Sequence, residues 1–429
     1  MTGVEVAAIG LGPSNLSLAA LAEPLGTLDL QCLESRRSFE WHPGLMLPGA
    51  QLQVSYLKDL VSLVDPTNRF SFLNYLVHHN RQYRFLIAHR DTPSRQEFEL
   101  YYRWVADQLP GIRWGHQVER IEVRDQGFDI HCANGNSTRS RTLVLGTGHS
   151  PLIPEFAQPV RGPDVLHSSE FLSVRPRTAG KEVLVVGAGQ SGAEVVNHLL
   201  SGENELPASV TWLSSRIGVM PLDDSPFTNE WFTPGYIDYF YRLPAARREE
   251  LLRQQRMASD GASEWLIRDI YRQLYRLDLS DDKRMTYRLL PCRRMTGLTR
   301  TNDQRYRATF DNEDTGAQES CQAHVVILCT GYRSALPDYA EGLRPYLAAT
   351  DGGFEIQPDY SLAWDGPPGL RVYLQNGARH THGIADPNLS LAAWRSARIL
   401  NSICGNDVYD LDASQSTVSW SGDSTGVLT

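Results

Sequence analysis

The chain contains two glycine-rich turns, each between an apolar run and a helix-forming segment. The first turn, GLGPSN, follows the apolar run at residues 4–9 and precedes LSLAALAE. The second, GAGQSG, follows the apolar run at residues 183–186 and begins 177 residues later (187 − 10). A buried strand, a tight glycine turn and a helix in this order begin a βαβ unit. The sequence therefore predicts an α/β fold with two Rossmann-like domains.

The first turn carries Gly10 and Gly12 at the first two glycine positions and Asn15 at the third. Such a turn lets backbone N–H groups and a helix N-terminus approach a pyrophosphate. The next apolar run, LDLQCLE, ends at Glu34, 24 residues after Gly10 (34 − 10), where a carboxylate accepts hydrogen bonds from a ribose diol. We therefore predict a dinucleotide site that uses Gly10, Gly12, Pro13, Ser14, Asn15 and Glu34.

The second turn matches the full GxGxxG pattern, and the strand after it ends without an acid. Its tip reads Ser214, Ser215 and Arg216. Hydroxyls and a guanidinium bind a 2′-phosphate, which a carboxylate would repel, so this pattern favours NADPH over NADH. The alternative is that Arg216 is a solvated surface charge. The usual partnership of two such folds is FAD at the first and NADPH at the second, here at Gly187, Gly189, Gln190, Ser191 and Gly192.

Two apolar runs end in Thr-Gly, in TLVLGTGHSP and in HVVILCTGYR. We expect the chain to pass between the two domains at these points, with Gly148 and Gly331 allowing close approach to cofactor. The prediction is a FAD-binding domain at 1–165 and 331–429 and a NADPH-binding domain at 166–220 and 286–330. Residues 221–285 are rich in aromatic residues, Arg and Leu at helical spacing and predict a small helical substrate-binding insert. The Ser- and Gly-rich tail at 412–429 predicts poor order.

Composition excludes several functions. The net charge of −9 argues against nucleic-acid binding. No apolar run approaches the length of a transmembrane helix and the start is unlike a signal peptide, so we expect a cytoplasmic protein. The six cysteines form no CxxC pair, which excludes a zinc clip and a redox dithiol beside a flavin. His42, His380 and His382 lack carboxylate partners at ligand spacing, so no metal site is expected.

Three longer blocks resemble one enzyme family. They are FEWHPGLMLPGAQLQVSYLKDLVSLVDPTNRFSFLNYL, DDSPFTNEWFTPGY and HTHGIADPNLSLAAWRSA. Together with both turns they are similar to the microbial N-hydroxylating flavin monooxygenases, the L-lysine N6-, L-ornithine N5- and diamine N-monooxygenases of siderophore biosynthesis. The resemblance extends to about residue 399. It implies FAD, NADPH and molecular oxygen, attack of a neutral primary amine on a C4a-hydroperoxyflavin, activity that rises toward alkaline pH, and a dimer or tetramer.

The resemblance also implies roles for single residues. Gln53 would lie against the isoalloxazine, and Lys58 would face the substrate and pair with its carboxylate in an amino-acid hydroxylase. Asn229 would contact substrate and nicotinamide. Ser390 would join the substrate pocket, and the remaining flavin contacts would be Trp41, His42, Val118, Asn388 and Leu389. The alternative for Lys58 is an exposed charge pair with Asp59.

One departure from the family pattern bears on the substrate. Ornithine enzymes carry TNYS before a helix that reads LIRDIYRQLY here, whereas this chain carries ASDGAS at 258–263. Ser259 or Asp260 then stands near the position of the asparagine that holds ornithine. The pattern favours L-lysine or a short diamine, cadaverine or putrescine, with L-ornithine as the alternative. HSSEF at 167–171 faintly resembles flavin monooxygenases of sulfur or ketones, and a non-catalytic flavin-binding redox sensor is a third hypothesis.

Overall fold

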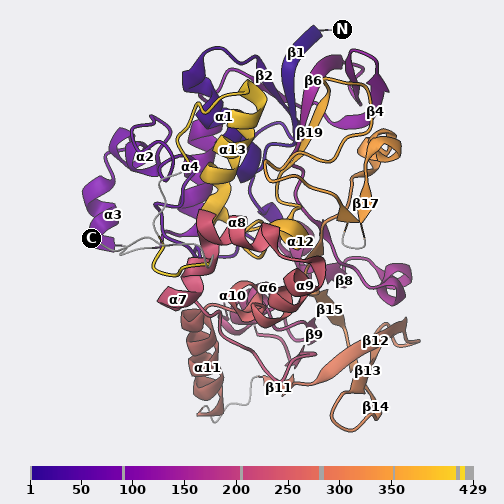
Figure 1. The fold of residues 1–429 in the computed structure, drawn as a ribbon. Helices are drawn as coiled ribbons and strands as arrows, with labels where there is room; N and C mark the ends of the chain where they lie inside the picture. Colours follow the sequence, from indigo (N-terminus) through magenta and orange to yellow (C-terminus); the bar gives the residue numbers. More distant parts are fainter. Residues whose placement is uncertain are drawn as a thin grey trace.

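The computed structural model describes residues 2–88, 92–202, 206–279, 285–350, 353–411 and 416–420. The described chain forms two lobes, each built on its own parallel sheet (Figure 1). The predicted α/β class with two Rossmann-like folds is confirmed. The division at numbered domain boundaries stays a prediction.

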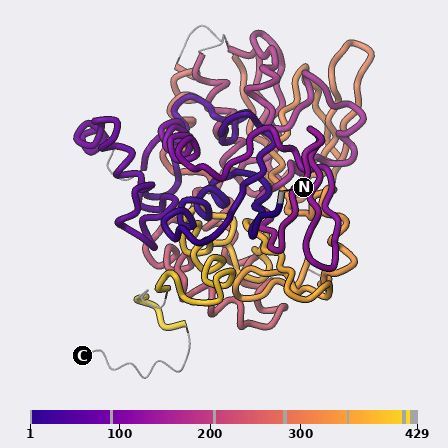
Figure 2. Tube along the Cα trace, turned by 90° about the horizontal axis from the view of Figure 1, so that it is seen from above, coloured from indigo at the N-terminus to yellow at the C-terminus, as the bar shows by residue number. Residues whose placement is uncertain are grey.

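The sheet of the first lobe joins strands from both ends of the chain. Strands β2, β1, β6 and β19 run parallel, with β3 parallel at one edge and β5 and β4 antiparallel at the other. The bounds are β1 (Thr2–Ile9), β2 (Leu30–Glu34), β3 (Ile112–Trp114), β4 (Val118–Arg124), β5 (Gly127–Cys132), β6 (Ser137–Leu145) and β19 (Arg371–Leu374). Because β19 pairs with β6, the C-terminal segment returns to this lobe. Helix α1 (Pro13–Ala22) then packs against α13 (Ala392–Cys404), which is why indigo and yellow segments lie together in Figure 2.

The sheet of the second lobe is wholly parallel, in the order β11-β10-β9-β15-β8. Near-continuous apolar runs such as VVIL suit strands that are buried on both faces. The elements are β8 (Val165–His167), β9 (Glu182–Val186), α6 (Gln190–Leu200), β10 (Ser209–Leu213), β11 (Thr286–Leu290) and β15 (Val325–Leu328). An antiparallel sheet of β12 (Arg293–Arg300), β13 (Tyr306–Asn312) and β14 (Gln318–Ala323) lies beside it.

The two Thr-Gly segments follow β6 and β15 directly, as the sequence predicts. Immediately after them, the short strands β7 (Ser150–Pro151) and β16 (Tyr332–Arg333) pair antiparallel. The outgoing and returning passages between the lobes therefore lie side by side.

The described part of the region at 221–285 is mainly helical, with a β-bridge between Pro221 and Ala262. Its helices are α7 (Pro226–Asn229), α8 (Pro234–Arg242), α9 (Ala245–Gln254), α10 (Met257–Asp260) and α11 (Glu264–Asp278). Phe232 and Ile237 belong to the core of the first lobe, whereas Leu266 and Ile270 belong to the core of the second. Helix α11 packs along α6, and α8 packs against α12 (Arg379–His382). These helices therefore bridge the two lobes.

Shorter elements complete the described chain. Helices α2 (Phe72–His78) and α3 (Gln82–Ala88) project from the first lobe, near α4 (Arg95–Ala106) (Figure 1). The others are α5 (Phe171–Val174), β17 (Ala349–Thr350) and β18 (Gly353–Phe354). Most of the predicted poorly ordered tail lies outside the described residues, but Trp420 stacks on Tyr239 of α8 with ring centroids 5.6 Å apart. No helix of the described residues is long and apolar enough to cross a membrane.

Candidate active site

The first glycine turn has the geometry that a pyrophosphate requires. Gly10 adopts a φ of +81°, where a side chain is strained, and a Cβ there would lie 3.0 Å from the carbonyl oxygen of Gly146. Gly12 caps α1 and faces open space, with a single atom, that same carbonyl oxygen, 4.0 Å from a built Cβ. Glu34 accepts hydrogen bonds from the N–H groups of Leu11 (2.7 Å) and Arg36 (2.8 Å), so its carboxylate lies at the turn. The turn, the helix start and this acid fit an adenine dinucleotide.

The third position of this turn works differently from a glycine. The amide of Asn15 is buried and donates to the carbonyl oxygens of Ile9 (3.2 Å) and Gly10 (2.8 Å). It also accepts from Gln375 Nε2 at 3.1 Å. The Asn15 side chain thus supports the turn from within the protein.

Arg395 braces the same turn and is missing from the sequence prediction. Its guanidinium donates to Ser14 Oγ (2.9 Å), to Gln375 Oε1 (3.1 Å) and to Asp386 Oδ1 (2.9 Å). Arg395 and Asp386 are 2% and 1% exposed. The available sequence signal was an arginine within the largely apolar segment LAAWRSA, a position at which a solvent-exposed arginine is not expected.

The second glycine turn is held by close packing. Gly187 adopts a φ of +110°, and a Cβ on it would overlap the carbonyl oxygen of Cys329. A Cβ on Gly192 would overlap the carbonyl oxygen of Gly187, which also accepts a hydrogen bond from Trp212 Nε1 at 2.9 Å. Gly189 caps α6 and faces a cavity. Gly187 and Gly192 therefore have to be glycine because backbone approaches them closely, whereas Gly189 has room for a Cβ and faces the cavity that a pyrophosphate would enter.

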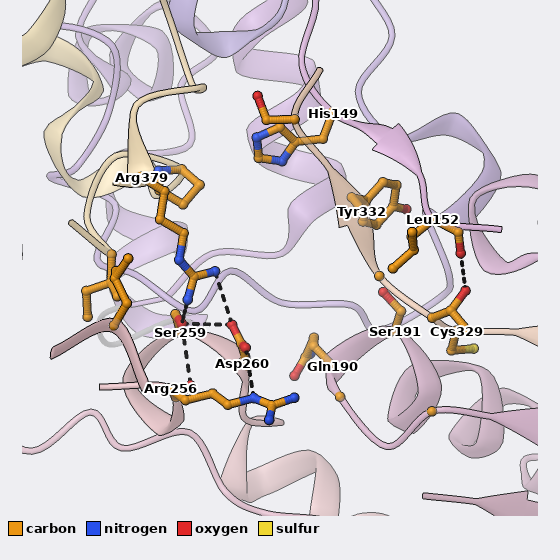
Figure 3. Close-up of a pocket in the computed structure, with 18 of the residues that line it drawn as sticks. His149, Leu152, Gln190, Ser191, Arg256, Ser259, Asp260, Cys329, Tyr332 and Arg379 are labelled. Carbon is orange, nitrogen blue, oxygen red and sulfur yellow. Dashed lines mark hydrogen bonds and ion pairs between the residues drawn. The ribbon is translucent and has the colours of Figure 1, made fainter. Parts of the chain in front are cut away.

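A cavity of about 1050 Å³ lies between the lobes and gathers many of the predicted residues. The predicted residues that line it are Gln53, Gly187, Gly189, Gln190, Ser191, Ser214, Ser215, Arg216, Ser259, Asp260 and Asn388. His149, Tyr332 and Arg379 line it too and were not predicted (Figure 3). Its size and its position at the carboxyl ends of parallel strands are typical of a dinucleotide site.

Arg216 is held in this cavity. Its Nη1 donates to the carbonyl oxygen of Asp260 at 2.8 Å, and its side chain is 20% exposed. Burial, followed by the neighbouring Arg256, lowers the pKa of Arg216, and Asp260 opposes that shift. The alternative of a solvated surface charge is therefore wrong. The hydroxyl of Ser214, two residues before Arg216, is buried and accepts from the Arg216 N–H at 3.0 Å.

The sequence analysis did not identify two further arginines beside the end of β10. Arg293 and Arg294 line the cavity, and the N–H of Arg293 donates to the carbonyl oxygen of Ser214 at 2.8 Å. Each is already paired, Arg293 with Glu319 (3.1 Å) and Arg294 with Glu313 (2.6 Å). The consecutive pair Arg293-Arg294 in the sequence was the available signal.

Gln53 connects the two lobes. Its Nε2 donates to Gln190 Oε1 and to Ser263 Oγ, both at 3.2 Å. Gln190 begins α6 and also accepts from the Ser263 N–H at 2.8 Å. One side chain of the first lobe thus touches both the second glycine turn and the start of α11.

Lys58 has an unusual environment for a lysine. Its Nζ donates to Ser390 Oγ at 3.0 Å, and that hydroxyl donates to Asn388 Oδ1 at 2.7 Å on the cavity wall. Burial lowers the pKa of Lys58. No carboxylate of the described residues lies within ion-pair distance of it. Asp59 instead accepts from the N–H groups of Val61, Ser62 and Phe72, so the alternative of a Lys58–Asp59 charge pair is wrong.

Several predicted residues lie away from the cavity. Asn229 is exposed at the end of α7, where its side chain donates to the carbonyl oxygen of Asp224 at 2.7 Å. Trp41 is buried edge-on against Tyr102, with ring centroids 5.3 Å apart. His42 has a φ of +47°, Val118 begins β4 in a buried position, and Leu389 is half-buried after Asn388. Their roles stay predictions.

Ser259 and Asp260 line the cavity from the bridging helices, among arginines. Ser259 Oγ donates to Asp260 Oδ1 at 2.8 Å and accepts from Arg379 Nη2 at 3.0 Å (Figure 3). The Asp260 carboxylate faces guanidinium groups, so an amine substrate would have to compete with them. Binding of substrate by these two residues stays a prediction.

Comparison with known proteins identifies relatives over nearly the whole chain. The L-lysine N6-monooxygenase of Escherichia coli is 39% identical over 420 residues, which cover 97% of this chain and 98% of that protein. The FAD-bound cadaverine monooxygenase of desferrioxamine biosynthesis from Erwinia amylovora has a TM-score of 0.91 at 31% identity, covering 97% of this chain and 98% of that one.

A third relative was solved with both coenzymes and an amino acid. The ornithine N-hydroxylase of a Kutzneria species, with reduced FAD, NADP+ and L-ornithine, has a TM-score of 0.86 at 29% identity and covers 94% of this chain and 99% of that one. The family model described as L-lysine 6-monooxygenase/L-ornithine 5-monooxygenase matches residues 3–334. This chain therefore belongs to the L-lysine 6-monooxygenase/L-ornithine 5-monooxygenase family, as the resemblance of its three sequence blocks predicted.

Proposed function

We propose that this protein is a FAD- and NADPH-dependent N-monooxygenase that hydroxylates the terminal primary amine of L-lysine, for the biosynthesis of a hydroxamate siderophore. The short diamines cadaverine and putrescine are the second substrate class, and L-ornithine is the alternative amino acid. Membership of the family and the 39% identity to a lysine enzyme support L-lysine. The structural match to a cadaverine enzyme supports the diamines.

The observation that carries the choice of L-lysine is the environment of Lys58. A half-buried ammonium without a carboxylate partner among the described residues is costly, and a charged hydrogen-bond partner would relieve that cost. L-lysine offers a carboxylate at the end opposite its reacting amine, whereas cadaverine offers a second cation. Lys58 therefore favours the amino acid.

When bound, FAD supplies the activation of molecular oxygen and NADPH supplies the reducing hydride. The glycine turns and α6 bind the phosphates, and Arg216 accommodates the 2′-phosphate. Lys58 and Ser390 hold the far end of the substrate, so that its amine points into the cavity. Gln53 orients groups at the junction of the lobes, where its amide reaches Gln190 and Ser263.

The substrate amine has to lose its proton before its lone pair can attack oxygen. An alkyl ammonium has an ordinary pKa near that of lysine, about 10.4. Within the apolar part of the cavity, which includes Phe156, Leu252 and Leu336, the neutral amine is favoured over the ammonium. The rate should therefore rise toward alkaline pH.

A substrate panel scored by hydroxylamine product tests this proposal. We expect hydroxylamine from L-lysine above cadaverine, putrescine and L-ornithine. Replacing Lys58→Ala should lower kcat/KM for L-lysine at least tenfold and that for cadaverine far less, because a single charge-assisted contact is lost. Lys181→Ala, which removes a half-exposed cation paired with Asp164, is the matched control.

Two results would contradict the proposal. The absence of hydroxylamine with all four amines would reject the reaction. Equal losses for L-lysine and cadaverine in Lys58→Ala would reject the role of Lys58 as a carboxylate partner. Product has to be measured directly, since NADPH consumption alone also counts oxygen reduction without hydroxylation.

We also propose that the protein is cytoplasmic and forms a dimer or tetramer. Six free thiols suit a reducing compartment, and NADPH is supplied there. Light scattering of the purified protein tests the oligomeric state, and fractionation of cells tests the compartment.

A further inference from the structure

Three arginines from separate parts of the chain surround one carboxylate at the cavity. Asp260 ends α10, and its Oδ2 lies 3.9 Å from Arg216 Nη2 and 3.5 Å from Arg256 Nε. Its Oδ1 lies 3.6 Å from Arg379 Nη1 (Figure 3). Arg216 follows strand β10, Arg256 lies in the turn between α9 and α10, and Arg379 begins α12 in the C-terminal segment.

These ion pairs are long and leave positive charge unbalanced. Charge-assisted hydrogen bonds between a guanidinium and a carboxylate are about 2.7–2.9 Å long, shorter than all three separations. Among the described residues, Asp260 is the one carboxylate within ion-pair distance of Arg216, Arg256 or Arg379. Three guanidiniums and one carboxylate leave two positive charges (3 − 1). The group is therefore suited to a further anion of about two charges.

A phosphate monoester carries about −1.5 to −2 at neutral pH, which matches this excess. The 2′-phosphate of NADPH binds beside the tip of the second strand of a Rossmann fold, and here that tip carries Arg216. The main-chain oxygen of Asp260 would lie 3.6 Å from a Cβ on Gly189, so the backbone of Asp260 lies beside the second glycine turn.

Arg379 is the arginine that the C-terminal segment adds to this group. It lines the cavity, its side chain is 40% exposed, and Ser259 and Asp260 hold the two ends of its guanidinium. We infer that Arg379 is a specificity-determining residue for the 2′-phosphate of NADPH, acting with Arg216, and that Asp260 is the positioning residue that brings them together. This inference rests on the proposed use of NADPH and extends it to a residue outside the second lobe.

Calorimetric titration of the FAD-loaded protein with 2′,5′-ADP and with 5′-AMP tests the inference, because the two ligands differ in the 2′-phosphate. The wild-type protein should prefer 2′,5′-ADP. Arg379→Met should reduce that preference about tenfold and leave 5′-AMP affinity unchanged. Arg379→Lys should keep part of the preference, because an ammonium pairs with phosphate through fewer hydrogen bonds. Arg344→Met, which breaks the exposed pair with Glu341, is the control.

Three outcomes would overturn the role of Arg379. The first is an unchanged preference in Arg379→Met. The second is an equal loss of affinity for 2′,5′-ADP and 5′-AMP, which would assign Arg379 to the adenosine 5′-phosphate that both ligands share. The third is an unchanged preference with a raised KM for L-lysine but not for cadaverine, which would assign it to the substrate carboxylate.

A double variant tests the positioning role of Asp260. If Asp260 holds Arg379 at the site, Arg379→Met should lower the preference less in an Asp260→Asn background than in the wild type. Strictly additive effects would overturn that role. Failure of the proposed function is distinguishable, because it would appear as an absence of hydroxylamine from the wild-type protein while the calorimetric preference stands.

Discussion

The two glycine turns share the same strand–turn–helix arrangement, but different contacts hold each turn in place. At the first, Asn15, Gln375 and Arg395 form a buried hydrogen-bond network in which two of the three residues come from the C-terminal segment. At the second, Gly187 is held by Gly192 and Trp212, within 25 residues of it, and by close approach to the carbonyl oxygen of Cys329 after β15. The identity of the third turn residue therefore follows from what surrounds it. Asparagine is found in the first turn, where buried carbonyl oxygens accept hydrogen bonds from its amide. Glycine is found in the second turn, where the backbone of Gly187 leaves no room for a Cβ.

This difference has a structural consequence. The first turn is complete only when α13 lies on α1, because the Arg395 guanidinium has to reach Ser14. The second turn needs only its own strand, its own helix and the two neighbouring strands, β10 and β15. Loss of the Arg395 side chain should therefore damage the first turn and leave the second turn intact.

The largest effect is expected from Arg395→Met. This change leaves the Asp386 carboxylate, which is 1% exposed, without its cation, and breaking a buried pair from one side costs about 3–5 kcal/mol. Urea unfolding should show a loss of about 4 kcal/mol, with loss of bound FAD. Arg398→Met on the same helix breaks a more exposed pair with Asp238 and should cost less than about 1 kcal/mol. Similar losses for the two variants would refute a special role for the buried network.

A smaller effect is expected from Gly192→Ala. The added methyl overlaps the carbonyl oxygen of Gly187, so the backbone of the second turn has to shift, at a cost of about 2 kcal/mol. Affinity for 2′,5′-ADP should fall while the flavin content stays at the wild-type level. Gly162→Ala, whose Cβ meets nothing within 4 Å, serves as the comparison. Equal loss of both coenzymes would show that the turns are not independent.

The smallest effect on stability is expected from Gly12→Ala. The backbone there has a φ of −84° and a ψ of 180°, which alanine adopts readily, and the added methyl faces open space. The free energy of unfolding should change by less than about 0.5 kcal/mol. Retention of FAD should nevertheless fall, because the methyl would occupy the approach of the pyrophosphate. Wild-type flavin content in the purified variant would contradict this assignment.

The sequence predicted the local units well because glycine turns and apolar runs are local signals. The strand predicted at 183–186 is found at Glu182–Val186, and that at 4–9 is found at Thr2–Ile9. Helix α6 starts at Gln190, within the GAGQSG turn, because the residues after the Gly189 cap are already helical. Hydrophobic spacing also predicted the helices at 221–285 but could not tell which lobe each would pack on.

Three of the missed residues have a common cause. Arg379, Gln375 and Arg395 reach the site because β19 returns to lie beside β6, and neither spacing nor composition reports that pairing. For Lys58 and Asp59, adjacency in the sequence suggested an ion pair that the structure does not contain. These neighbours point to different partners, since the carboxylate is used by backbone N–H groups and the ammonium by Ser390.

The pairing of β7 with β16 also bears on how such an architecture is assembled. The chain leaves the first lobe and returns to it at adjacent positions. The strands before and after the second lobe, β6 and β19, are neighbours in the sheet of the first lobe. The second lobe is thus inserted into the first, and its two connections to the first lobe lie next to each other. A short linker could join the two ends at these passages, but an exchange of the second lobe between relatives would have to keep Phe232 and Ile237, which belong to the core of the first lobe.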